Sequence, residues 1–234
     1  MTAYFRDLAL EQDAASLSQS EPSDPTGSIR PRRGVYRNRG KVFLDILLVT
    51  ISLPVLLPVI AILALLVSLD GGAPFYRQRR LGRNGRVFQM LKLRTMVPDA
   101  EAQLEACLAR DPEARREWKS KQKLCHDPRI TRLGVILRRT SLDELPQIWN
   151  VLKGDMSLIG PRPMMVDQEG LYPGRAYYAL RPGITGLWQV FGRNGTSFAE
   201  RARFDDAYDA SLSLGTDLRV LVRTVWVVLR CTGY

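Results

Sequence analysis

A long apolar segment over residues 42–69 constrains the fold of this chain more than any other feature. Asp45 is its one charged residue. As a straight α-helix it would be about 42 Å long at 1.5 Å per residue, which is enough to cross a bilayer. Pro54 and Pro58 lie in its middle, where a proline removes a backbone donor and breaks or kinks a helix. The sequence therefore predicts a membrane helix that does not cross in a straight line.

Basic residues flank this segment on both sides: Arg30, Arg32, Arg33, Arg37, Arg39 and Lys41 before it, and Arg77, Arg79 and Arg80 after it. The positive-inside rule places both flanks in the cytoplasm. We therefore expect a re-entrant helix over 41–70 that enters the membrane, bends and returns. The preceding basic run suits contact with anionic lipid. Residues 1–40 otherwise lack a sustained apolar period and are predicted to be mostly disordered.

Residues 71–234 are predicted to form a cytoplasmic catalytic domain. The fold class expected is α+β and predominantly helical, on the re-entrant helix, with amphipathic interfacial helices. Strands or extended chain are predicted near 74–77, 87–91 and 156–159, and helices near 99–123, 130–138, 143–153, 164–172, 198–210 and 217–230. The last helix places Arg219, Arg223 and Trp226 on one stripe, which suits either a membrane surface or a core helix with a solvated edge.

The composition narrows the classes of partner. The net charge of +10 suits nucleic acid, anionic lipid or phosphorylated substrates. No zinc-finger spacing or RNA-binding aromatic motif is visible, so we expect no nucleic acid partner. His126 is the single histidine, which excludes any mechanism that needs two. Three cysteines, an odd count, indicate reduced thiols rather than a disulfide framework.

Two adjacent carboxylates, Asp143 and Glu144, are the strongest chemical signal. Neighbouring positions on a helix do not face each other, so the two acids suit a nucleophile beside a metal ligand better than an acid–base pair. Asp143 is expected at a helix N-terminus, whose positive field favours the carboxylate that an oxygen nucleophile requires. The alternative is that both acids only cap a helix.

Several motifs together give a resemblance. They are Lys-Val-Phe-Leu-Asp (41–45), Leu-Lys-Leu-Arg-Thr-Met (91–96), Asp-Pro-Arg-Ile-Thr (127–131), Ser-Leu-Asp-Glu-Leu-Pro-Gln (141–147), Lys-Gly-Asp-Met-Ser (153–157), Gly-Pro-Arg-Pro (160–163), Arg-Pro-Gly-Ile-Thr-Gly (181–186) and Gly-Arg-Asn (192–194). From residue 41 to its end the chain resembles the bacterial sugar transferase family, monotopic polyprenyl-phosphate phosphoglycosyl transferases that initiate exopolysaccharide synthesis. It looks like the minimal form. The family's re-entrant helix bends at a Ser-Pro pair, whereas this chain has Leu53-Pro54.

The resemblance implies a reaction and a set of roles. A nucleoside diphosphate sugar donates its sugar phosphate to Asp143, and polyprenyl (undecaprenyl) phosphate then accepts it. Glu144 would bind Mg²⁺, which prefers carboxylate and phosphate oxygens. Arg138, Arg162 and Arg193 would line the phosphate site, because a guanidinium can hold two phosphate oxygens at once. The context of residues 186–190 looks like members that handle a UDP-hexose, glucose or galactose.

Further site residues and other functions stay open. Lys92 and Arg94 are expected to share a strand face, where they either add positive charge to the site or are solvent-exposed. The expected location is the cytoplasmic face of a bacterial inner membrane. The alternatives are a membrane-bound metal-dependent phosphohydrolase, in which water resolves the intermediate, and a non-enzymatic basic membrane adaptor.

Overall fold

The computed structural model describes residues 34–121, 124, 127–192 and 198–229. This part is predominantly helical, as predicted, with two sheets of two strands each. The elements are η1 (Tyr36–Gly40), α2 (Lys41–Ser68), β1 (Phe75–Leu81), η2 (Arg83–Gly85), β2 (Val87–Leu93), α3 (Ala100–Arg110), α4 (Pro112–Lys121), α5 (Arg132–Thr140), η3 (Leu142–Gln147), α6 (Ile148–Leu152), β3 (Ser157–Ile159), η4 (Val166–Leu171), α7 (Ala176–Ala179), β4 (Gly183–Thr185), η5 (Trp188–Gly192), α8 (Arg201–Ser211) and α9 (Leu214–Leu229).

The described residues form two compact units, which are interleaved along the chain. The first unit comprises residues up to 51, 79–90 and 148–226, and the second comprises 52–78, 91–147 and those after 226. The chain passes between them within α2, β1, β2 and α9, so neither unit is a continuous stretch of sequence.

The apolar segment is helix α2, which continues through both prolines without interruption. The prolines therefore do not end the helix, and the kink that they favour stays a prediction. Each proline costs one intrahelical hydrogen bond, whereas ending the helix would expose several backbone groups among apolar side chains. Ile51 and Val55 are each 67% exposed, and the span Tyr36–Ser68 is long and apolar enough to cross a membrane. Whether the helix returns to its side of entry stays a prediction.

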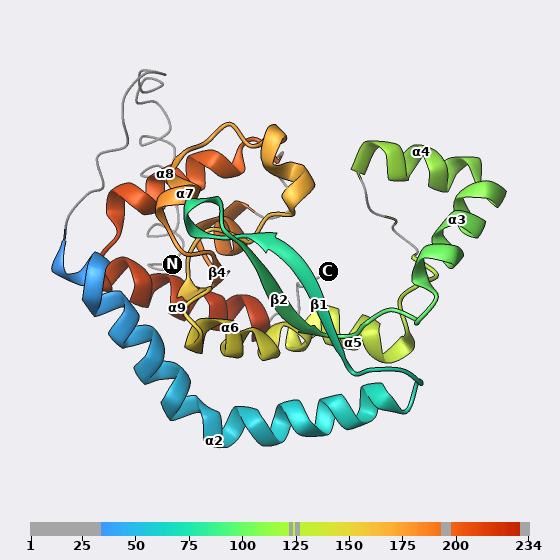
Figure 1. The fold of residues 1–234 in the computed structure, drawn as a ribbon, viewed down its shortest axis with the longest axis horizontal. Coiled ribbons are helices and arrows are strands. Elements are labelled where there is room, and N and C mark those ends of the chain that lie inside the picture. Colours follow the sequence, from blue (N-terminus) through green and yellow to red (C-terminus); the bar gives the residue numbers. More distant parts are fainter. Residues whose placement is uncertain (1–33, 122–123, 125–126, 193–197, 230–234) are drawn as a thin grey trace, which may run out of the picture. The chain divides into compact units, whose positions relative to one another are not determined.

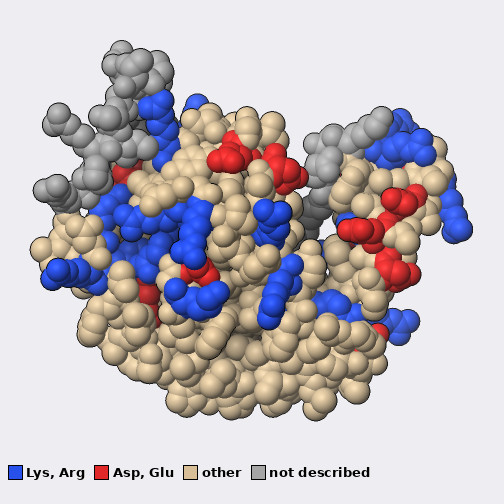
Figure 2. Space-filling view, viewed as in Figure 1, with Lys and Arg blue, Asp and Glu red and all other residues tan. Residues whose placement is uncertain are grey.

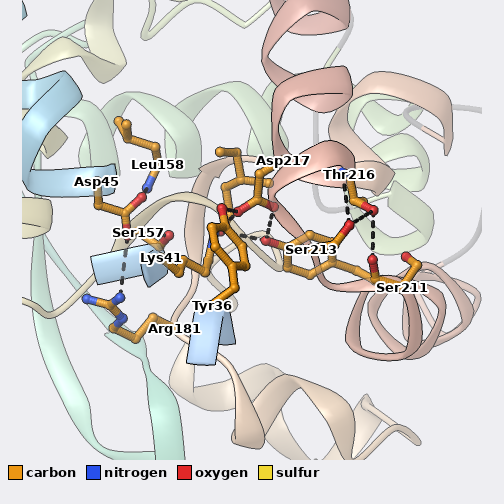
Figure 3. A network of polar contacts seen from close by, with 12 residues as sticks. Tyr36, Lys41, Asp45, Ser157, Leu158, Arg181, Ser211, Ser213, Thr216 and Asp217 are labelled. Atoms are coloured by element: carbon orange, nitrogen blue, oxygen red, sulfur yellow. Dashed lines mark hydrogen bonds and ion pairs between the residues drawn. The ribbon is translucent and has the colours of Figure 1, made fainter. Parts of the chain in front are cut away.

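The start of α2 is fixed in the first unit by a buried charge network (Figure 3). Lys41 Nζ lies 2.8 Å from the Asp217 carboxylate, to which the Tyr36 and Tyr208 hydroxyls also donate, each at 2.6 Å. Lys41 and Asp217 are buried. Lys41 therefore binds the first turn of α9 and does not contact lipid as the basic run predicted.

Asp45, on α2 itself, is a second buried acid with several polar partners. Asp45 accepts hydrogen bonds from the Ser157 hydroxyl at 2.8 Å and from the Leu158 amide at 3.1 Å, and lies 3.4 Å from the Arg181 guanidinium. Arg37 likewise pairs with Asp209 of α8. Residues 34–40 are therefore ordered by these contacts, although they belong to the segment over 1–40 that was predicted to be mostly disordered. Residues 1–33 lie outside the described part of the chain.

Strand β3, predicted as extended chain, pairs in parallel with β4, with Ser157 opposite Gly183 and Ile159 opposite Thr185. The sequence indicated only turn residues at β4, because three residues are too few to show an alternating pattern. Ile159, Leu180 and Val190 form a core cluster beside this sheet, together with Tyr208 of α8 and Val220 of α9.

In the second unit, the end of α2 packs on the end of β2 and on α5 through Ala64, Val67, Leu93 and Leu137. The helix predicted over 99–123 is two helices, because Pro112 cannot continue the helix begun at residue 100 and instead starts α4. His126 lies outside the described residues.

Helix α9 matches the predicted C-terminal helix, and its buried positions are Asp217 and Val220. Arg219 and Trp226 of the predicted stripe are exposed, while the Arg223 guanidinium lies 5.7 Å from the ring centroid of Phe191. Val222 and Val225 are exposed as well. The exposed side of α9 therefore carries an apolar row beside Arg219.

Candidate active site

The acidic pair lies on a tight turn rather than at the cap of a long helix. Ser141 adopts a left-handed conformation at φ 59° and ends α5. Asp143 and Glu144 follow within η3, a 3₁₀ helix that contains Pro146, and α6 begins only at Ile148. The predicted single helix over 143–153 is therefore wrong, whereas Asp143 does lie in the first turn of a helix, the short η3. The tighter 3₁₀ turn accommodates Pro146 where the α-helical pattern was expected to begin.

Lys92 of β2 pairs with both acids. Its Nζ lies 2.7 Å from Glu144 Oε1 and 3.7 Å from Asp143 Oδ2. Asp143 is buried, and the side chains of Lys92 and Glu144 are mostly enclosed. This geometry agrees with the expectation that Lys92 adds positive charge at the acids. It does not agree with the alternative, in which Lys92 is solvent-exposed.

Arg138, near the end of α5, is held by a residue that sequence reasoning did not single out. Its Nε donates to Thr95 Oγ1 at 2.8 Å, and Thr95 is buried. The Thr95 carbonyl in turn accepts from the Thr131 amide at 3.1 Å. A Cβ at Gly134 would lie only 2.1 Å from that carbonyl, so the close approach requires glycine there. The signal was available, since Thr95 stands inside the Leu-Lys-Leu-Arg-Thr-Met motif.

The electrostatics of Asp143 differ from the expectation drawn from a helix N-terminus. Burial is the main cause that raises the pKa of the Asp143 carboxyl, and the neighbouring Glu144 charge raises it further. Lys92 and then Arg138 act in the opposite direction. The two cations therefore favour the carboxylate form of Asp143, against burial and the charge of Glu144. Burial also lowers the pKa of the Arg138 guanidinium, against the attraction of Asp143.

Arg94 does not share the environment of Lys92. Its Nη2 donates to the Val67 carbonyl at 3.0 Å, near the C-terminal end of α2. A cation at a helix C-terminus is favoured by the helix dipole. Arg94 therefore anchors the end of α2, while Lys92 contacts the acids.

Arg162 belongs to the other compact unit, in the turn after β3. The turn is tied to β4, because the Gly160 amide donates to the Thr185 carbonyl and the Gly183 amide to the Pro161 carbonyl, each at 2.8 Å. Arg193 lies outside the described residues. The structure thus brings Asp143, Glu144, Lys92 and Arg138 together in one unit and describes Arg162 in the other.

The donor set of the acidic pair suits Mg²⁺. Within the described ranges no group of three or more His, Cys, Asp or Glu side chains could hold a metal ion. Mg²⁺ commonly uses one or two carboxylates and takes its other ligands from water and substrate phosphates. The oxygens of Glu144 and Asp143 already accept one cation, the Lys92 ammonium, so the residues fit a small hard cation shared with a phosphorylated substrate.

Comparison with known proteins agrees with the motifs. The model of the family described as bacterial sugar transferase matches residues 36–231. The UDP-galactose-lipid carrier transferase of Erwinia amylovora is 50% identical over 180 residues, covering 76% of this chain and 38% of that protein. The exopolysaccharide production protein ExoY of Rhizobium meliloti is 41% identical over 226 residues, covering 94% of this chain and 98% of ExoY.

A third relative, the UDP-glucose:undecaprenyl-phosphate glucose-1-phosphate transferase of Caulobacter vibrioides, is 39% identical over 196 residues, covering 79% of this chain and 68% of that protein. The chain thus spans about two fifths of the Erwinia relative and nearly all of ExoY. The family model covers most of its length. The chain belongs to the bacterial sugar transferase family.

Proposed function

We propose that this protein transfers a sugar 1-phosphate from a nucleoside diphosphate sugar to polyprenyl phosphate, as the first membrane step of exopolysaccharide synthesis. The observation that carries the proposal is a buried carboxylate, Asp143, set between two cations and a second acid. The chain belongs to a family described as bacterial sugar transferases, and one relative is named as a glucose-1-phosphate transferase.

In the first step, an oxygen of the Asp143 carboxylate attacks the phosphorus that carries the sugar. The new bond is an acyl phosphate, and the bond to the nucleoside monophosphate breaks, so that UMP leaves with the electron pair. In the second step, a phosphate oxygen of the lipid attacks the same phosphorus. Asp143 leaves as a carboxylate, and the product is polyprenyl diphosphate sugar.

Positive charge is the main requirement of both steps, because two anions meet at one phosphorus. Lys92 and Arg138 supply it beside Asp143, and we assign Arg162 and Arg193 to the phosphates of the substrates. In Figure 2, Lys and Arg side chains outnumber Asp and Glu on the face shown, in keeping with the net charge of +10. Such a surface attracts phosphorylated substrates.

Glu144 is the residue we assign to Mg²⁺, with Asp143 close enough to share it. When bound, the ion would neutralise phosphate charge as the monophosphate leaves. Glu144 has a second effect in the geometry described here, since its charge raises the pKa of the Asp143 carboxyl. A cation on Glu144 would offset that effect and favour the ionised nucleophile.

The proposed location is the cytoplasmic face of a bacterial inner membrane, with α2 re-entrant. The support is the exposed apolar surface of α2, drawn almost without charges in Figure 2, and the basic residues on both flanks. Cysteines introduced at Gly34 and at Arg83 should both resist a membrane-impermeant thiol reagent in intact cells. Labelling of one position alone would show that α2 crosses the membrane.

We also propose that α9 lies on the membrane surface, with its apolar row toward the lipid. The support is the exposure of Val222, Val225 and Trp226 on one helix face. Replacing these three with Gln should weaken binding to anionic liposomes when α2 is shortened to residues 41–51. Unchanged binding would favour a helix that another protein covers.

The donor is proposed to be UDP-glucose or UDP-galactose, since the relatives carry those sugars in their names. A panel of sugar nucleotides, assayed for monophosphate release with and without polyprenyl phosphate, tests the whole proposal. Release that depends on the lipid and yields a lipid-linked sugar is expected. Multiple turnovers without lipid would identify a phosphohydrolase, and no release with any donor would favour a membrane adaptor.

A further inference from the structure

The Gly-Pro-Arg-Pro turn is held from two sides by buried or half-buried arginines. Pro161 and Pro163 have no backbone N–H, so the carbonyl oxygens of the turn are its main attachment points. Arg201 Nη2 donates to the Arg162 carbonyl at 2.7 Å. Arg80 Nη1 donates to the Pro163 carbonyl at 3.1 Å. All five residues lie in the first compact unit, so the base of Arg162 is fixed by its own unit.

Arg201 makes a second connection to Arg162 through an aromatic ring. Its guanidinium carbon lies 4.9 Å from the centroid of Trp188 and 4.9 Å from that of Phe198. The Arg162 guanidinium carbon lies 5.8 Å from the same Trp188 centroid. Two cations therefore share one indole ring, which favours a defined placement of each. Arg201 itself is only 7% exposed, so it cannot bind a large substrate directly.

The charge of Arg201 is offset from inside the unit. Asp205, one helical turn further along α8, attracts it, whereas Arg162 lies near enough to repel it. Asp205 is buried and accepts a hydrogen bond from the Tyr172 hydroxyl at 2.6 Å. Asp205 offsets the charge of Arg201. Arg162, which is half-buried, is therefore the more exposed of the two neighbouring cations. An anion in front of Arg162 would relieve the remaining repulsion.

We propose that Arg201 is a positioning residue, which holds the Arg162 guanidinium toward a phosphate of the nucleoside diphosphate donor. It acts through the Arg162 carbonyl and the shared Trp188 ring. The role rests on the proposed function, in which Arg162 binds phosphate. Arg201 was not among the predicted site residues, because 39 residues separate it from Arg162.

A double-mutant cycle on the full-length chain in detergent tests the role. The variants are Arg201→Met, Arg162→Met and the double substitution, assayed for kcat/KM toward the sugar nucleotide. If Arg201 acts through Arg162, Arg201→Met should lower kcat/KM about tenfold or more alone, but less than about threefold in the Arg162→Met background. Arg203→Met is the matched control, since Arg203 is an exposed neighbour on α8. It should leave kcat/KM unchanged both alone and in the Arg162→Met background.

A binding measurement separates this role from the proposed function. UDP should raise the midpoint of thermal unfolding. The apparent affinity for UDP can therefore be measured in this way for the wild type and the same three variants, without any turnover. If the wild type binds UDP but transfers no sugar phosphate, the proposed function is contradicted. The mutant cycle on the affinity for UDP then decides the role of Arg201. Equal losses from Arg201→Met in both backgrounds, in either assay, would overturn the positioning role and indicate a structural one. If Arg201→Met does not fold, Arg201→Lys replaces it in the same cycle, because lysine retains the charge without the planar guanidinium.

Discussion

Lys92 offers the sharpest test of how a neighbouring cation sets the pKa of Asp143. Replacing Lys92 with Met keeps its stem and removes its charge, which lies 3.7 Å from Asp143 Oδ2. Two unit charges at that distance interact by about 4 kcal/mol at an effective dielectric of about 20. If only a third of this remains after screening and relaxation, about 1.4 kcal/mol, the ratio of carboxylate to acid on Asp143 falls about tenfold at a given pH.

The assay is the initial burst of UMP release from pH 5 to 9. Because Lys92 lowers the pKa of Asp143, its removal raises that pKa. The acid limb of the pH–rate profile should therefore move to higher pH, while the rate on the plateau at high pH largely recovers. Lys153→Met is the control, since Lys153 is half exposed and pairs with Asp155. A rate lowered equally at every pH would refute this reasoning and indicate that Lys92 contacts the substrate instead.

Two further predictions concern stability. Lys41→Met should destabilise the protein by about 3–5 kcal/mol in denaturant unfolding, because it leaves the Asp217 carboxylate buried without its cation; the exposed Arg39→Met is the control, and equal effects would contradict the argument. Burial raises the pKa of Asp205 to about 7, so its protonated form stabilises the fold at low pH, and roughly 4 kcal/mol should be lost as the pH rises from about 4 through 7. Asp205→Asn should therefore remove most of this dependence of stability on pH, and parallel stability profiles would argue against a buried titrating group.

Local patterns predicted much of the fold. The apolar run over 42–69 predicted the longest helix, and the sequence pattern placed α5, α8 and α9 within a few residues. The division between α3 and α4 could have been predicted, because Pro112 stands inside the segment assigned as one helix. The strand β4 could not, since its three residues are defined by pairing with β3 rather than by their own pattern.

The contacts around the candidate site were less accessible from sequence. Thr95 binds Arg138 across 43 residues, and Arg201 binds Arg162 across 39. Such pairs depend on tertiary packing, which no local period encodes. The acidic pair was found through its motif, but its electrostatics were not, because the burial that raises the pKa of Asp143 is likewise a property of the folded unit.

The central claim is that Asp143 becomes covalently bound to the sugar phosphate. Wild-type protein incubated with labelled UDP-glucose or UDP-galactose and no lipid should release about one equivalent of UMP. Peptide mapping should then place the labelled sugar phosphate on the peptide that contains Asp143. Asp143→Asn should show neither burst nor adduct. An enzyme that forms lipid-linked sugar only when both substrates are present, with no adduct on Asp143, would contradict the account and indicate direct transfer in a ternary complex.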